Sequence, residues 1–353
     1  MMSISTITMP CIALTPMGNL RPDSRKPADR QQAKSLWMNS LELLESADGV
    51  DLTRLAHFLN QLEAVCEEQW DFAKTSKADR LFQRLTRLAE RTGLDPEMES
   101  MRPVVLRRLG SLYQAQGRHQ EAENLLRRAL NSAQAIFGKQ SEETAEVQHH
   151  LATLYQERGQ FGAAANYYWR ALSNYQRLPS TESVKSAGIY HDLSGMERRR
   201  GNTAEAEQLA SHSLEIRMRV QGMTNPAVAT EMIWLADLMI ERKKFDEAER
   251  FYRGAIGIIE SAYDAEHYEI ATTLAKLAAL CTIQDRAAEA ERCLLRAVAI
   301  KERLFGIENL EVAQLRNELA ELYELQSRHE EAAQLMCKAQ TIFNKATGAL
   351  KPV

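Results

Sequence analysis

Apolar and polar positions along this chain follow a pattern that returns every 42 residues. Within one unit, residues 109–130, the apolar residues stand three, four and seven positions apart, which is the spacing of a helix with one apolar face. Two slots never vary: Leu109, Leu151, Leu193, Leu235, Leu277 and Leu319 fill one, and Ala122, Ala164, Ala206, Ala248, Ala290 and Ala332 fill the other. A strict long period of this kind predicts a repeat architecture.

Each unit predicts two helices joined by a short turn. At the turn, glycine tolerates the positive φ that ends a helix, whereas other residues give weaker local support. The turn slot reads Gly117, Gly159, Gly201, Lys243, Asp285 and Ser327. Small residues beside the invariant leucine let two helix axes approach closely. Because an isolated pair cannot bury its apolar face, the units must stack, and we expect an all-α, right-handed solenoid of stacked antiparallel helix pairs.

The order of small, large and aromatic slots resembles the tetratricopeptide repeat, and the 42-residue version resembles that of kinesin light chains. The unit boundaries are similar to that family's Gly-x-x-His-Pro-x-Val-Ala junction. They read Gly222-Met-Thr-Asn-Pro-Ala-Val-Ala229, Asp264-Ala-Glu-His-Tyr-Glu-Ile-Ala271 and Gly306-Ile-Glu-Asn-Leu-Glu-Val-Ala313. Asn225 followed by Pro226 is also a sound helix start. The resemblance covers about residues 98–348 and implies the fold, but such arrays serve many unrelated tasks.

The pattern divides the chain into four parts. Residues 1–27, rich in proline, predict a flexible N-terminal arm, and residues 28–93 predict an irregular helical cap with one atypical repeat. Six repeats span 94–348, and 349–353 form a tail. Because nothing comparable covers the sixth repeat, we expect Leu335, Ala339, Ile342 and Phe343 to be partly exposed. The alternatives there are a frayed last helix and a surface for homo-oligomerisation.

Composition narrows the class of protein. Of the 353 residues, 44% are hydrophobic and 26% charged, and the net charge is −4, which is typical of a folded protein without a general attraction for nucleic acid or membrane. No segment approaches the ~20 apolar residues that span a bilayer. Five cysteines lack paired spacing, and Pro10 interrupts the only segment that suggests a secretory signal, so we predict a cytoplasmic protein with reduced thiols.

No motif for catalysis is found. Gly138-Lys139 lacks the rest of a phosphate-binding loop, and neither His-Glu-x-x-His nor Gly-x-Ser-x-Gly occurs. His149, His150 and His191 are the one cluster that suggests a metal site. Adjacent repeats would separate His149 from His191 by about 10 Å, which is too far to share one ion. We therefore predict no enzymatic activity, no cofactor and no metal.

The resemblance implies that the first helix of each repeat lines a concave groove. The candidate groove residues are Arg107, Arg108, Ser111, His149, His150, Thr153, His191, Arg198, Trp234, Asp237, Lys276 and Asn317. Kinesin light chains carry asparagines in the two slots before the invariant leucine. Only Asn317 matches them, so the resemblance does not supply a cargo class.

The groove charges are graded along the chain. Arginines, including Arg198 and Arg199, and histidines dominate the first half, acidic residues dominate the end, and Trp234 stands between. This pattern predicts a peptide or protein ligand with acidic residues facing the N-terminal half. If the histidines contact its carboxylates, affinity should rise as the pH falls from about 7 to 6. Local alternatives are a helix-capping role for Arg198, solvated histidines and core packing of Trp234.

The sequence thus favours a protein-interaction scaffold that binds a peptide segment or partner protein in the groove. The first alternative is a self-associating regulator whose groove is closed by its own arm, with residues 4–14 as the candidate segment. A second, nucleic-acid binding along the arginine and histidine half, is disfavoured by the acidic half and by the lack of an aromatic stacking series.

Overall fold

The computed structural model describes residues 83, 86–87, 96–177, 183–263 and 265–346. All of them belong to one compact unit that spans residues 48–353. The predicted N-terminal arm, nearly all of the predicted cap and the predicted tail lie outside the described residues.

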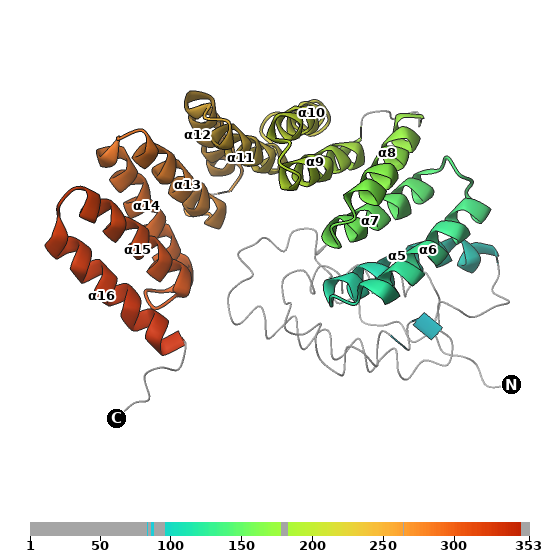
Figure 1. Cartoon of the computed structure of the whole chain (residues 1–353), viewed down its shortest axis with the longest axis horizontal. Helices are drawn as coiled ribbons and strands as arrows, with labels where there is room; N and C mark the ends of the chain where they lie inside the picture. The colour runs from blue at the N-terminus through green and yellow to red at the C-terminus, as the bar shows by residue number, and fades with distance from the viewer. Residues whose placement is uncertain (1–82, 84–85, 88–95, 178–182, 264, 347–353) are drawn as a thin grey trace, which may run out of the picture. The chain divides into compact units, whose positions relative to one another are not determined.

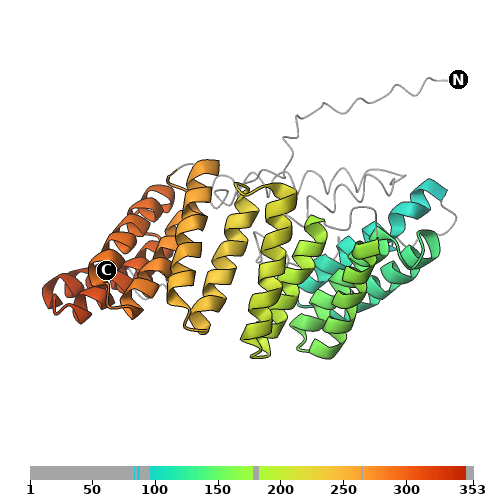
Figure 2. The ribbon, with the colours of Figure 1, turned by 90° about the horizontal axis from the view of Figure 1, so that it is seen from above.

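The regular elements of the described residues are helices, arranged as six consecutive pairs. The pairs are α5 (Pro96–Ala115) with α6 (His119–Ile136), α7 (Glu142–Glu157) with α8 (Phe161–Arg177), α9 (Val184–Arg199) with α10 (Thr203–Gln221), α11 (Pro226–Glu241) with α12 (Phe245–Ala262), α13 (Tyr268–Ile283) with α14 (Ala287–Phe305), and α15 (Leu310–Leu325) with α16 (His329–Ala346). The pairs follow one another in chain order (Figures 1 and 2). This arrangement confirms the predicted all-α solenoid of stacked helix pairs. None of the described helices is long and apolar enough to cross a membrane.

The invariant slots form the core of every pair. All six leucines of the first slot are at most 3% exposed, and all six alanines of the second slot are fully buried. Burying a leucine side chain stabilises a fold by roughly 1.5–3 kcal/mol. In the first pair the helices approach so closely that a Cβ on Gly110 would lie 2.7 Å from Leu126 Cγ. The small slot beside the leucine is therefore required by packing, as the sequence predicted.

The turn between the two helices of a pair has one conformation in all six repeats. Its φ is 75°, 71° and 85° at the three glycines, and 59°, 59° and 62° at Lys243, Asp285 and Ser327. The backbone hydrogen bonds also match: Gly117 N–H donates to Gln114 O, and Lys243 N–H donates to Ile240 O. A side chain in this left-handed region costs about 1–2 kcal/mol. Packing of the flanking helices therefore sets the turn even where glycine is missing.

The end of the last pair differs from the sequence-based expectation. Ala339 is fully buried and Ile342 is 6% exposed, because both pack with Ala313 of α15. The prediction that these two side chains are partly exposed is therefore wrong, whereas Leu335 and Phe343 are partly exposed as predicted. The exposed large apolar side chains of this pair are Leu310, Leu325 and Met336. Self-association through α16 stays a prediction.

Candidate binding site

All twelve candidate residues lie on the first helices of the pairs. They are Arg107, Arg108 and Ser111 on α5, His149, His150 and Thr153 on α7, His191 and Arg198 on α9, Trp234 and Asp237 on α11, Lys276 on α13, and Asn317 on α15. Three consecutive first helices, α7, α9 and α11, together line a cavity of about 480 Å³. Its lining residues are Gln156, His191, Asp192, Gly195, Arg198, Arg199, Trp234 and Glu241.

This cavity brings together only three of the candidates, His191, Arg198 and Trp234. Its volume falls in the range of about 300–1,000 Å³ that is common for ligand pockets. Room for it exists partly because residue 195 is glycine, where an added Cβ would already lie 3.9 Å from the Trp234 ring. Lys276 and Asn317 lie on later helices and do not line the cavity.

Trp234 is held in place on several sides. Its indole N–H donates a hydrogen bond of 2.9 Å to the Ser194 hydroxyl, which in turn donates to Ala206 O. The His191 ring lies 5.3 Å from its ring, and the Arg198 guanidinium lies 5.0 Å from its ring centroid. Part of the side chain packs against the core, as one of the alternatives expected. Trp234 is thus a fixed aromatic surface that is still partly open to the cavity.

The two arginines at the end of α9 differ. The Arg198 Nε donates to Glu241 of α11 at 2.6 Å, so this side chain links adjacent repeats. Arg199 is exposed, and within the described residues its side chain has no hydrogen bond or ion pair. A guanidinium group carries five N–H donors in a fixed plane. Arg199, which was not among the twelve candidates, is therefore the cation of the cavity that is open to a ligand.

His191 is committed to a buried carboxylate. Its Nδ1 lies 3.1 Å from both oxygens of Glu231, and Arg217 Nε lies 3.3 Å from the same carboxylate. Glu231 is only 2% exposed. Burial alone would disfavour the imidazolium, but the bonds to Glu231 outweigh it and raise the pKa of His191. The positive charge of His191 is thus neutralised inside the protein.

His150 has the opposite environment. Its Nδ1–H donates to the backbone carbonyl of Glu146 at 2.8 Å, and its Nε2 faces a guanidinium nitrogen of Arg107 at 3.2 Å. Burial and the charge of Arg107 hold the pKa of His150 well below its usual range. This contradicts the expectation that His150 becomes a cation between pH 7 and 6, so the predicted increase in affinity cannot come from it.

Most of the other groove charges are also paired between repeats. Arg107 is 6% exposed and lies 3.1 Å from Glu146. His149 lies 2.5 Å from Asp192, and Lys276 lies 2.5 Å from Asp237. The predicted charge gradient is therefore largely a series of internal ion pairs. The sequence held a signal for this, because each of these pairs is separated by 39 to 43 residues, close to one repeat.

Two of the remaining polar candidates form hydrogen bonds within their own helices. Ser111 Oγ donates to Arg107 O, and Thr153 Oγ1 donates to His150 O. Arg108 is half-buried, and burial lowers its pKa. Within the described residues, no three His, Cys, Asp or Glu side chains lie close enough together to hold a metal ion.

Comparisons with known proteins agree with this architecture. A family model described as tetratricopeptide repeat matches residues 102–177, 185–261, 230–302 and 269–345. A search of curated proteins found no match. Among solved structures, BtubC (BKLC) from P. vanneervenii is 23% identical with a TM-score of 0.54, covering 67% of this chain and 90% of that one. A putative kinesin light chain from Podosopora anserina with TPR-like repeats is 21% identical with a TM-score of 0.52. The match covers 58% of this chain and 98% of that one. The apo form of RapI is 15% identical with a TM-score of 0.52, and the match covers 70% of this chain and 99% of that one.

Proposed function

The chain belongs to the tetratricopeptide repeat family, and we propose that it is a non-enzymatic scaffold that binds a peptide segment of a partner protein on its first helices. The family supports a role in protein interaction in general terms. The observation that supports this particular surface is the cavity across α7, α9 and α11, where the open Arg199 and the fixed ring of Trp234 line one space.

The chemistry of these two side chains defines the ligand. Trp and Arg are the residue types most often found as binding hot spots, because they combine a large contact area with directed hydrogen bonds. Trp234 is already fixed by its bond to Ser194, so little conformational freedom is lost when a ligand covers it. The ligand is a segment that places an apolar group against Trp234 and a carboxylate against Arg199.

Internal pairing limits which charges take part. Arg198 is bound to Glu241, and His191 to Glu231. A ligand carboxylate that displaced Glu231 from His191 would leave a buried carboxylate without its cation, which is costly. Glu241 is more exposed, but a ligand at Arg198 would still have to displace it. Arg199 has no such partner in the described residues, so it is the arginine that contributes most to the recognition of an acidic ligand.

A display selection tests this proposal. Random peptides are selected on the full-length protein, and the enriched peptides are then measured by fluorescence anisotropy against Arg199→Glu, Trp234→Ala and the matched control Arg250→Glu. Arg250 is also an exposed arginine, but it lies on the second helix α12. We expect Arg199→Glu to weaken binding by about tenfold or more, since a charged hydrogen bond contributes roughly 1.5–3 kcal/mol. Arg250→Glu should leave affinity unchanged.

The reverse result is equally clear. If the selected peptides carry no acidic residues and bind Arg199→Glu and Trp234→Ala as tightly as the unaltered protein, the ligand site is not this cavity. Circular dichroism of both variants confirms that the helices remain formed.

A further inference from the structure

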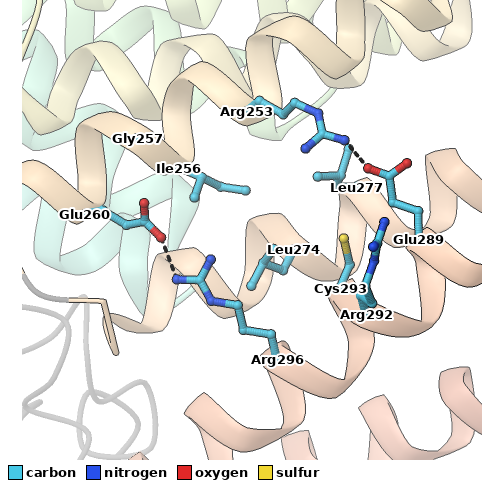
Figure 3. A pocket seen from close by; sticks show the side chains of 10 residues that line it. All are labelled: Arg253, Ile256, Gly257, Glu260, Leu274, Leu277, Glu289, Arg292, Cys293 and Arg296. Carbon is cyan, nitrogen blue, oxygen red and sulfur yellow. Dashed lines mark hydrogen bonds and ion pairs between the residues drawn. The ribbon is translucent and has the colours of Figure 1, made fainter.

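A second cavity lies on the side of the second helices. Its volume is about 390 Å³, and it is formed between α12 and α14 with α13 behind them (Figure 3). The lining residues are Arg253, Ile256, Gly257, Glu260, Leu274, Leu277, Glu289, Arg292, Cys293 and Arg296. None of these residues lines the cavity that contains Arg199 and Trp234.

Two local departures from the repeat pattern create this space. In each of the five other repeats, the slot of Cys293 holds a larger side chain: Leu125, Tyr167, Leu209, Phe251 and Leu335. The slot of Gly257 likewise holds a residue with a side chain in each of the five other repeats: Asn131, Ser173, Glu215, Ala299 and Thr341. A Cβ added to Gly257 would meet no atom within 4 Å. The cavity therefore exists because this junction carries the two smallest residues that these slots contain.

The base of the cavity is apolar. Ile256, Leu274, Leu277 and Cys293 line it, and each is less than a tenth exposed. Figure 3 shows Leu274 and Leu277 of α13 between the side chains of the two second helices. An aliphatic group that entered here would remove apolar surface from water, which favours its binding.

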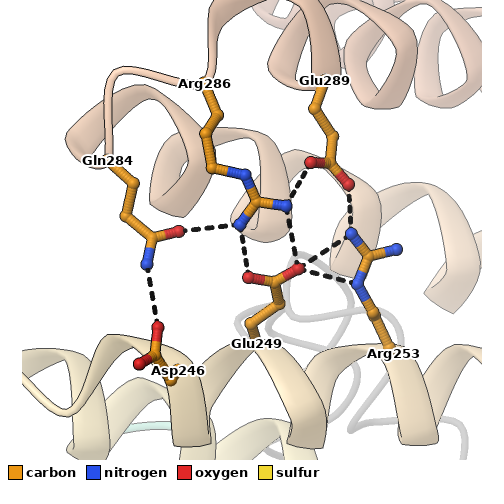
Figure 4. A network of polar contacts seen from close by, with 6 residues as sticks. All are labelled: Asp246, Glu249, Arg253, Gln284, Arg286 and Glu289. Carbon is orange, nitrogen blue, oxygen red and sulfur yellow. Dashed lines mark hydrogen bonds and ion pairs between the residues drawn. The ribbon is translucent and has the colours of Figure 1, made fainter.

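The rim is charged, and the charges do not cancel. Arg253 is paired with Glu289, and Arg296 lies 2.5 Å from Glu260 (Figure 3). Arg253 also bonds to Glu249 within the network of Figure 4. Arg292 is exposed and has no ion pair or hydrogen bond with any residue of the described ranges. Arg286 shares Glu249 and Glu289 with Arg253, so the rim and its network hold four arginines against three carboxylates and lack one negative charge.

We propose that this cavity is a second docking site of the scaffold, which takes a peptide segment of a partner with an aliphatic side chain next to an aspartate or glutamate. The aliphatic side chain lies on Ile256, Leu274 and Leu277. The neighbouring carboxylate bonds to Arg292 and balances the rim. A guanidinium and a carboxylate form directed, charge-assisted hydrogen bonds, which favour an acidic neighbour over an uncharged one.

Cys293 provides a readout at the site itself. Burial raises the pKa of this thiol, so iodoacetamide alkylates it slowly at mildly alkaline pH. The probe is a capped tetrapeptide, Ser-Leu-Asp-Ser, added to the full-length protein. We expect the peptide to slow alkylation of Cys293 until the rate levels off, as measured by mass spectrometry of the proteolytic fragment that contains it. The exposed Cys337 on α16 serves as the internal control, and its rate should not change.

Matched peptides and variants decide the chemistry. The peptide Ser-Leu-Asn-Ser should need about tenfold higher concentration for the same protection, because it lacks the charge. Arg292→Glu should abolish protection, whereas Arg250→Glu, the same slot one repeat earlier, should retain it. The double variant Gly257→Ser, Cys293→Leu fills the cavity with residues that other repeats carry in these slots, so it should fold normally. It should no longer bind the peptide, and saturation-transfer NMR of the peptide measures this loss.

Several results would overturn the proposal. They are equal protection by the Asp and Asn peptides, protection that persists in Arg292→Glu, binding that persists in the filled variant, and failure of every peptide to protect Cys293. Loss of binding in Trp234→Ala would assign the peptide to the first-helix cavity and would likewise exclude this site.

Discussion

Ion pairs join adjacent repeats on both sides of the helix pairs, but the two sides differ in burial. On the first helices, Glu231 is 2% exposed and lies between His191 of α9 and Arg217 of α10. On the second helices, Glu249, Arg253 and Glu289 form a network with Arg286, the residue before α14 (Figure 4). The side chains of this network are 16% to 49% exposed. The same kinds of side chain thus act in two environments.

The difference follows from desolvation. Removing one partner of a buried pair leaves an uncompensated charge without water, whereas water replaces the partner of an exposed pair. The cluster around Glu231 therefore fixes how α9, α10 and α11 meet, and with them the position of Trp234. The network around Glu249 is more exposed, so we expect it to contribute less to the geometry of the fold.

The largest expected effect comes from the buried carboxylate. Glu231→Ala leaves His191 and Arg217 without their shared partner, and we expect it to lower the free energy of unfolding by about 3–5 kcal/mol. Urea denaturation followed by circular dichroism measures this loss. If Glu231→Ala lowers the free energy of unfolding by less than Glu249→Ala in the surface network does, the two sides do not differ as proposed.

Two histidines of the first helices sharpen the comparison through pH. The pKa of His191 is raised, so its contribution to stability is complete below about pH 6.5 and is lost as the pH rises through the folded-state pKa. The pKa of His150 is lowered, so its neutral form supports the fold above about pH 6.5, and this support is lost as the pH falls. We expect His191→Gln and His150→Gln to change the pH dependence of unfolding in opposite directions. Denaturation at several pH values between about 5 and 8 checks the sign for each.

The turn between α11 and α12 lies between the helix of Glu231 and the helix of Glu249. A substitution in this turn changes the local backbone strain without changing either ion-pair network. Lys243 has a φ of 59°, where glycine is favoured. Lys243→Gly relieves the strained backbone but increases the freedom of the unfolded chain, so we expect a net stabilisation of no more than about 1 kcal/mol. Thermal unfolding compares it with Gly201→Ala, which introduces the strain at the same slot and should destabilise the protein.

The smallest effect is expected at the surface network. Glu249→Ala should cost less than about 1 kcal/mol, because solvent and the remaining charges compensate for the lost partner. The cost should shrink further at about 1 M salt, where the screening length falls to about 3 Å. The cost of Glu231→Ala should respond much less to salt. Equal salt sensitivity at both positions would show that burial does not separate them.

The sequence predicted the helices more completely than the site. Leu109, Ala122 and their counterparts recur every 42 residues with helical spacing inside each unit, which predicts stacked helix pairs. The turn at Gly117 reappears at Lys243 with the same hydrogen bonds. The twelve candidates all fell on the first helices, as predicted. The sequence did not predict the roles of single residues. Arg107, a candidate for ligand binding, is buried, whereas Arg199, which was not a candidate, is open to the cavity.

The sequence by itself determined the repeat, its two helices, its turn and the set of helices that carry the polar slots, because these depend on spacing along one chain. Only the tertiary structure decided which charges neutralise one another. Arg198 pairs with Glu241, while Arg199, its neighbour in the chain, has no pair in the described residues. The physical reason is that an ion pair depends on distances of a few ångströms between side chains about one repeat apart, and those distances exist only once the repeats have stacked.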